Sequence, residues 1–159
     1  MALEEHHHQQ QNHPALSAEL IQNPCQFRVT VVPEVVVKKS TAVLGAFAPN
    51  LIATVGCDRK EGLKLRHKAM IWGMYVMPEW RGRALGRALL MAAIARAREV
   101  AGLEQLLLQL GIANAAAAAL YKSLGFAAYG MEPRGLKIGD RYCDEYLMML
   151  ELSGKYGLE

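Results

Sequence analysis

One short segment combines glycine and arginine at the point where an apolar stretch ends and an Ala- and Leu-rich stretch begins: Arg81-Gly82-Arg83-Ala84-Leu85-Gly86-Arg87-Ala88. The start of a helix presents unpaired backbone N–H groups and the positive end of the helix dipole, and glycine lets a phosphate approach the backbone closely. Residues 81–88, which we call the cradle, are therefore predicted to bind a phosphorylated ligand.

Two common phosphate motifs do not fit the cradle. The Walker loop requires four residues between its glycines, then Lys and Ser or Thr, whereas three residues separate Gly82 from Gly86 and Arg87 follows. The dinucleotide fingerprint G-x-G-x-x-G requires three glycines, and the cradle has two. Neither loop explains the segment.

The cradle does match Q/R-x-x-G-x-G/A, with Arg81 at the first position and Gly86 at the last, the signature of the GCN5-related N-acetyltransferase (GNAT) superfamily. Residues 114–126 are similar to the second motif of that family, N-x-x-A-x-x-L-Y-x-x-x-G-F. Since both motifs occur at the right separation, the chain resembles the family over residues 41–152. It departs at Ala84, where the family usually has glycine; we expect a slightly tighter pocket, and alanine also favours helix.

The elements before the cradle are predicted from pattern. Residues 41–48 and 51–56 are predicted to form two strands of a hairpin joined by the turn pair Pro49-Asn50, and a polar loop is expected over 58–66. The nearly continuous apolar run 69–76 indicates a strand buried on both faces. Residues 14–23 are weakly helical, and the short segment 14–40 leaves open whether the family's first strand is present.

The elements after it alternate between helix and strand. A helix is predicted over 83–100, a strand over 106–110 and a second helix over 115–124 capped by Asn114, followed by strands at 126–129 and 142–152. This order favours an α/β (α+β) fold with helices packed on a mixed sheet. The resemblance implies a mostly antiparallel, twisted sheet whose central strands splay apart.

The resemblance implies that the donor is acetyl-CoA. The backbone amides of the cradle would hold its pyrophosphate, and Asn114 is a further contact or only a helix cap. A bulge near the end of strand 69–76 would let backbone groups of Met74 and Val76 pair with the pantetheine arm, one N–H stabilising the oxyanion. Tyr121 would be the general acid that protonates the departing thiolate.

The general base is not identified by the motifs. Many family members have a glutamate at the position of Met70, and methionine cannot accept a proton. His67, Glu79 and an ordered water are the candidates, of which water is preferred. Near the C-terminus, Asp144 and Glu145 are candidates for receiving a cationic acceptor, although exposed strand carboxylates are commoner.

The expected activity is transfer of an acetyl group from acetyl-CoA to a primary amine of a small molecule or amino acid, in a ternary complex. A protein N-terminal or lysine acetyltransferase and a non-catalytic acyl-CoA-binding module are the alternatives. The net charge of the whole chain is only +3. A basic cluster lies over 59–68, and without nucleic-acid motifs it is best explained as a solvated loop.

Composition and length set the remaining expectations. We expect one acetyltransferase domain over 14–153, a disordered leader or expression remnant over 1–13 and a tail over 154–159. No metal, nucleic acid or membrane is expected as a partner, and a homodimer is left open. Three widely spaced cysteines, Cys25, Cys57 and Cys143, fit a reducing cytoplasm.

Overall fold

The computed structural model describes residues 28–31 and 41–152, which form seven strands in one sheet, two α-helices and one 3-10 helix. The sheet order is β1-β2-β3-β4-β5-β7-β6. The bounds along the chain are β1 (Arg28–Val31), β2 (Thr41–Phe47), β3 (Leu51–Arg59), β4 (Lys68–Val76), η2 (Pro78–Trp80), α1 (Leu85–Glu99), β5 (Gln105–Gly111), α2 (Ala115–Ser123), β6 (Ala127–Ile138) and β7 (Arg141–Glu151).

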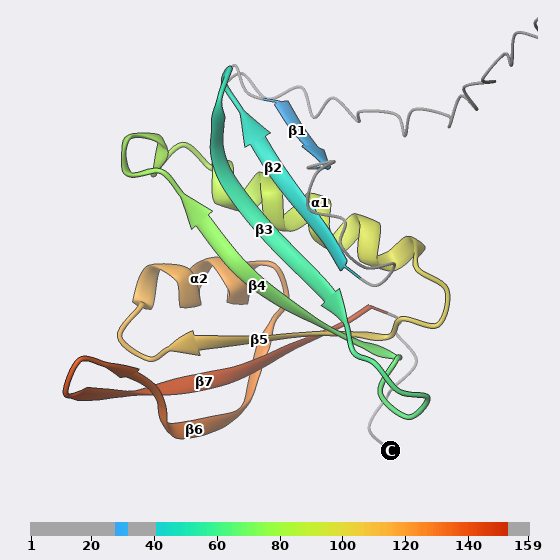
Figure 1. Cartoon of the computed structure of the whole chain (residues 1–159), viewed down its shortest axis with the longest axis vertical. Coiled ribbons are helices and arrows are strands. Elements are labelled where there is room, and N and C mark those ends of the chain that lie inside the picture. Colours follow the sequence, from blue (N-terminus) through green and yellow to red (C-terminus); the bar gives the residue numbers. More distant parts are fainter. Residues whose placement is uncertain (1–27, 32–40, 153–159) are drawn as a thin grey trace, which may run out of the picture.

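The sheet is antiparallel except at its centre, where β4 and β5 run parallel. These two strands pair only at their beginnings, Lys68 to Met70 with Gln105 to Leu107, and then diverge (Figure 1). The fold class and the expected separation of central strands are therefore confirmed. We call the gap between the free ends of β4 and β5 the splay.

A bulge lies in β4 just where that strand leaves β5. Thr54 faces Tyr75 while Gly56 faces Trp72, so β4 contains one more residue than β3 over this interval. Gly73 takes a left-handed conformation there (φ 58°), and its carbonyl oxygen accepts a hydrogen bond of 3.0 Å from Oγ1 of Thr54. The expected bulge is thus present, and Gly73 allows it because glycine adopts the left-handed conformation without strain.

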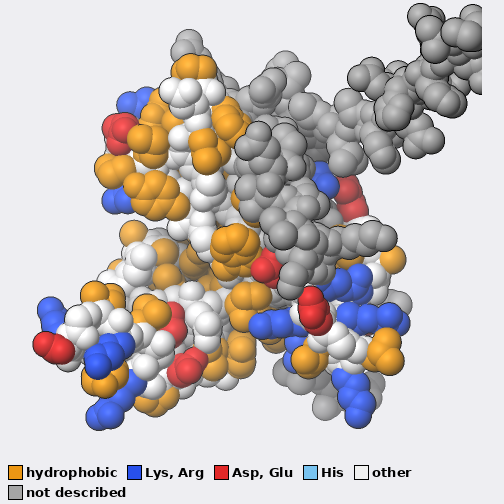
Figure 2. Space-filling model, viewed as in Figure 1, with side chains coloured by type: hydrophobic (Ala, Val, Ile, Leu, Met, Phe, Trp, Pro, Cys, Tyr) orange, Lys and Arg blue, Asp and Glu red, His pale blue; other side chains and the backbone are white. Residues whose placement is uncertain are grey.

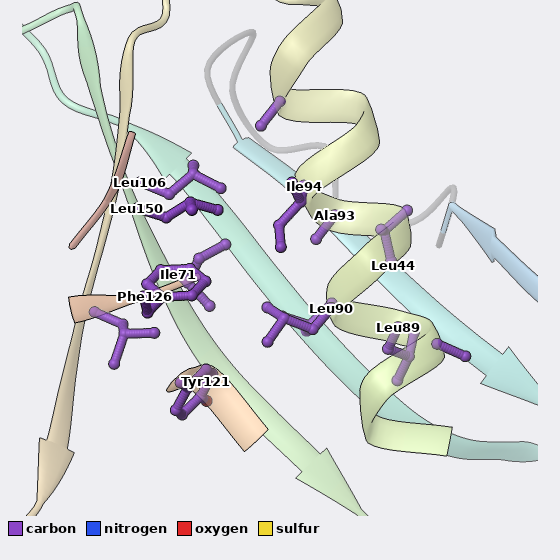
Figure 3. Close-up of a cluster of buried hydrophobic side chains, with 14 of the residues drawn as sticks. Leu44, Ile71, Leu89, Leu90, Ala93, Ile94, Leu106, Tyr121, Phe126 and Leu150 are labelled. Atoms are coloured by element: carbon purple, nitrogen blue, oxygen red, sulfur yellow. The ribbon is translucent and has the colours of Figure 1, made fainter. Parts of the chain in front are cut away.

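Both α-helices pack on the same face of the sheet. Leu85, Leu89 and Leu90 of α1 are fully buried where that helix packs mainly on β3 and β2, and Tyr121 of α2 belongs to the same apolar cluster (Figure 3). In β4, Ala69 and Ile71 point into this cluster, and Val55 does so from β3. The intervening side chains of β3 and β4 lie on the opposite face, which neither described α-helix covers and which we call the open face.

Several sequence predictions need correction. β3 continues to Arg59, so the loop expected from residue 58 begins two residues later. β4 is not buried on both faces, because Trp72 and Tyr75 are 42% and 53% exposed. β6 runs through the expected loop, since a register shift between Glu132 and Leu136 absorbs the proline and glycine there.

The other boundaries differ little. α1 begins at Leu85 rather than residue 83, and the hairpin of β2 and β3 is confirmed. A first strand is present as β1, antiparallel to β2. The helix expected over 14–23, the leader and the C-terminal tail fall outside the described residues.

Candidate active site

The cradle lies between the end of β4 and the first turn of α1. Gly82 has φ 74° and Ala84 has φ 58°, which turns the backbone sharply before the helix begins at Leu85. The first helical hydrogen bond runs from the N–H of Ala88 to the carbonyl of Ala84, so the N–H groups between them are free of intrahelical partners. A Cβ on Gly82 would have no atom within 4 Å, so this side of the turn is open to a ligand.

Three arginines surround this turn, and each is held in place. The guanidinium of Arg83 lies 5.0 Å from the ring centre of Trp80, and that of Arg81 lies 5.9 Å from the ring of Tyr75. Nη1 of Arg87 donates a 2.7 Å hydrogen bond to Oγ of Ser123 at the end of α2. All three are exposed, so they present positive charge where the helix dipole is also positive.

Ala84 corrects one sequence prediction. It was expected to favour helix, but it precedes α1 as the N-cap residue in the left-handed region (φ 58°, ψ 10°), and its side chain makes no capping hydrogen bond. An L-residue with a Cβ is strained there, so alanine destabilises this turn instead of supporting the helix.

The splay exposes backbone groups of β4 on the side that β5 has left. Beyond Met70 the register gives β4 a partner only in β3, so Met74 and Val76 offer main-chain groups toward the gap. The carbonyl of Val76 already accepts a 3.0 Å hydrogen bond from Nε of Arg81. The N–H of Val76 and the backbone of Met74 are the more available groups for a ligand.

Gly86 allows the two halves of this region to meet. A Cβ on Gly86 would lie 3.1 Å from Cε of Met74, 3.6 Å from Leu120 and 3.7 Å from Val76. The start of α1 therefore contacts the end of β4 and α2 at once. The cradle, the splay and α2, predicted separately from two motifs, are brought together at this point.

Tyr121 lies at one end of the buried cluster (Figure 3), and its ring meets the edge of Phe126 with centres 5.7 Å apart. Tyr121 is 6% exposed, and burial raises the pKa of its phenol above the ordinary value. A phenol is protonated at neutral pH, as a proton donor must be, and burial extends this to more alkaline pH. Leu120 beside Tyr121 approaches Gly86, so α2 passes close to the start of α1.

Asn114 caps α2 as predicted. Its Oδ1 accepts a 3.1 Å hydrogen bond from the N–H of Ala117. The residue also borders a pocket of about 490 Å³ between the end of β5 and the hairpin of β6 and β7. Apolar and aromatic side chains dominate this pocket, which sequence patterns did not signal: Ile112, Leu136, Ile138 and Tyr142.

The candidate bases do not all lie near the splay. His67 precedes β4 at the end remote from the bulge, where its carbonyl accepts hydrogen bonds from Glu104 and Gln105. Seven residues separate it from Met74, roughly 23 Å along a strand, which is too far for proton transfer. Glu79 is an exposed residue of η2. The basic side chains around His67 gather over the β3–β4 loop, at the lower right of Figure 2.

The two carboxylates near the C-terminus are engaged in the hairpin. Oδ1 of Asp144 accepts a 2.8 Å hydrogen bond from the N–H of Arg134. Glu145 is only 7% exposed and packs against Gly135, since a Cβ there would lie 2.6 Å from Oε2. Exposed strand carboxylates were the commoner explanation from sequence, but neither Asp144 nor Glu145 is fully exposed.

One carboxylate on the open face escaped the sequence analysis. Asp58 lies in β3 directly opposite Met70 of β4, and its Oδ1 is buried with no hydrogen-bond partner among the described residues. The available signal was its spacing from Thr54 and Gly56, which places every second residue of β3 on one face. Because four charged residues in succession begin at Asp58, the sequence predicts a loop there.

Neither described α-helix is long and apolar enough to cross a membrane.

Comparison with protein families identifies the family: the model described as the Acetyltransferase (GNAT) family matches residues 7–126, more than half of the chain.

One curated relative and two solved structures are similar. Over 57 residues the chain is 47% identical to a mycothiol acetyltransferase of Thermobispora bispora, a match of 36% of this chain but only 19% of that protein's length. A GNAT-family acetyltransferase structure from Streptococcus pneumoniae has a TM-score of 0.68 at 26% identity, covering 74% of this chain and 70% of the other.

The second structure, a putative acetyltransferase from Salmonella typhimurium with its cofactor acetyl-CoA, has a TM-score of 0.66 at 25% identity and covers 75% and 69% of the two chains. With the family model, the sheet that splays at β4 and β5 and the cradle in agreement, the chain belongs to the acetyltransferase (GNAT) family.

Proposed function

We propose that this chain transfers the acetyl group of acetyl-CoA to a primary amine of a small molecule or amino acid by direct attack in a ternary complex. The observation that carries the proposal is the convergence at Gly86, where the cradle, the free end of β4 and the helix bearing Tyr121 come into contact. A donor held by its pyrophosphate in the cradle has its thioester within reach of the splay.

The residues present fit that donor. The free N–H groups at the start of α1 and the exposed arginines suit a pyrophosphate, and the open side of Gly82 admits it. Main-chain groups of Met74 and Val76 suit the amides of an extended arm, in the way an added strand pairs with a sheet edge. The acetyl-CoA named with the Salmonella structure supports the same donor.

The chemistry asked of the protein is positioning, oxyanion stabilisation and one proton donation. Backbone N–H groups of β4 near the bulge stabilise the negative charge that develops on the thioester oxygen, and Tyr121 protonates the departing thiolate. A phenol stays protonated throughout the neutral pH range, and burial, which raises the pKa of Tyr121, does not weaken this condition.

Release of free thiol from acetyl-CoA, measured across small amines, amino acids and peptides with free N-termini or lysines, tests the proposal. We expect turnover with at least one small amine and a preference for it over the peptides. Saturable binding of acetyl-CoA without turnover on any member would favour the non-catalytic binding module, and a preference for peptides would favour a protein acetyltransferase.

Tyr121→Phe tests the acid. We expect kcat to fall about 100-fold while the Kd for acetyl-CoA stays nearly unchanged, because general acid catalysis contributes on this scale. Tyr129→Phe is the matched control, since Tyr129 is 56% exposed on β6. An unchanged kcat in Tyr121→Phe would remove this phenol from the mechanism.

A further inference from the structure

On the open face, Asp58 places a carboxylate beside Met70, the position at which many family members have a glutamate. Asp58 and Met70 face each other across β3 and β4. Their neighbours Cys57 and Ile71 also face each other and belong to the opposite, helix-covered side, so the side chains of Asp58 and Met70 share the open face. Directly opposed Cβ atoms lie about 5 Å apart. A carboxylate at residue 58 therefore reaches the space beside residue 70.

One oxygen of this carboxylate has no hydrogen-bond partner in the part of the chain that the structure describes. This atom, Oδ1, is buried. The adjacent cation, Arg59, donates instead to the carbonyls of Arg66 and Ala101. An unpaired buried acceptor is costly, and no residue that the structure describes offsets that cost at Asp58. A donor brought by a ligand would remove that cost.

An aromatic surface adjoins the carboxylate on the same face. The indole of Trp72 lies over Gly56, since a Cβ on that glycine would be 2.3 Å from the ring. Gly56 and Asp58 are two residues apart, about 7 Å along β3. Trp72 is 42% exposed, so part of its ring is accessible to a cation. A carboxylate and an indole surface together form a site suited to an ammonium group.

We propose that Asp58 receives the ammonium of the acceptor, with Trp72 beside it, and accepts the first of its protons, taking the place of the carboxylate that Met70 lacks. This inference rests on the acetyltransferase activity proposed above. A carboxylate can take the proton directly or through one water.

Acetyl transfer by this route conserves atoms and charge. The acceptor R–NH3⁺ gives one proton to Asp58, which passes it to solvent, and the freed lone pair forms the C–N bond at the thioester carbon. As the C–S bond breaks, the thiolate takes a proton from Tyr121, which is replaced by the second proton leaving nitrogen. The products are the amide, the thiol of coenzyme A and one proton.

Asp58→Asn preserves size and removes the charge. With the best amine of the panel, we expect kcat/KM to fall about 100-fold while the Kd for acetyl-CoA and the Tm change little. Asp140→Asn, in the exposed turn between β6 and β7, is the matched control and should leave kcat/KM unchanged. Unchanged kcat/KM in Asp58→Asn, or the loss appearing instead in Glu145→Gln, would overturn the proposal.

Rescue separates a catalytic carboxylate from a structural one. Met70→Glu in the Asp58→Asn background returns a carboxylate to the neighbouring strand, and we expect it to restore at least 10-fold of the lost kcat/KM. A folded double variant with no recovery would overturn the shared role of the two positions.

Binding of n-butylammonium supplies a readout that does not depend on turnover. In protein saturated with coenzyme A, the indole N–H signal of Trp72, assigned by Trp72→Phe, should shift on titration at pH 7 in wild type but not in Asp58→Asn. If wild type turned over no amine, the proposed function would fail while this comparison still decided the role of Asp58. Equal shifts in both proteins, or none in wild type, would overturn it.

Discussion

Replacing Ala84 by glycine should stabilise this protein, although alanine to glycine is usually a destabilising change. Ala84 has φ 58° and ψ 10° just before α1. The left-handed conformation costs an L-residue about 1–2 kcal/mol, which glycine does not pay. Glycine also makes the unfolded chain more flexible, at a cost of about 0.4–1 kcal/mol. The difference leaves Ala84→Gly more stable by about 0.5–1 kcal/mol.

The matched control is the same substitution inside a helix. Ala95 is exposed in the middle of α1, where glycine costs about 1 kcal/mol relative to alanine. For a chain of this size, 1 kcal/mol corresponds to about 2–4 °C in Tm. We therefore expect Ala84→Gly to raise the Tm by about 1–4 °C and Ala95→Gly to lower it by about 2–4 °C.

Thermal unfolding followed by circular dichroism, with urea denaturation as a second measure of the unfolding free energy, tests the opposite signs. The two variants carry identical chemical changes, so a difference in sign can arise only from backbone conformation. If both variants lost stability equally, Ala84 would not be left-handed in solution, and the conformation assigned to the cradle would be wrong.

Three further experiments test the surroundings of the site. Asn114→Ala should lower the unfolding free energy by about 1 kcal/mol, because the cap to α2 is lost, whereas Asn114→Ser should retain most of it in urea denaturation. Burial first, then the charge of its acidic neighbour, raises the pKa of Cys57 to about 11, so at pH 8 iodoacetamide should alkylate it more than about 100-fold slower in the folded than in the urea-unfolded protein, by peptide mass spectrometry. The rate should rise with pH toward 11, and equal rates would contradict the burial. Gly135→Ala should cost about 1–3 kcal/mol because its Cβ would meet Glu145 at 2.6 Å, while Gly111→Ala, with open space around it, should be nearly neutral; equal losses would refute the packing.

The sequence predicted the turn before α1 and the cap of α2 because the determinants of both are local. A glycine at 82, a run of helix formers after it and an asparagine at 114 each act within one turn of chain, and φ 74° and the cap of α2 agree with them. Periodicity likewise placed α1, which was predicted over 83–100 and runs over Leu85–Glu99. The splay required the resemblance, since no local pattern states where β4 leaves β5.

The failures share one cause, which is that tertiary pairing overrides local composition. β6 continues through Pro133 and Gly135 because the partner strand β7 is long and a register shift accommodates them. Asp58 is held in β3 by Met70 on one side and Thr41 on the other, although its neighbours are polar. A polar run marks a loop only when no strand is available to pair with it.

This difference also bears on whether Met70 signals a lost activity. The proposed donor contacts rest largely on main-chain groups, so they tolerate side-chain change as long as the backbone can adopt the required φ. The proposed acceptor contact rests on a single charged side chain, but directly opposed residues of two strands lie only about 5 Å apart. A carboxylate can therefore move from β4 to β3 without leaving the open face. The methionine at residue 70 is informative only together with the residue that faces it, and in this chain that residue is Asp58.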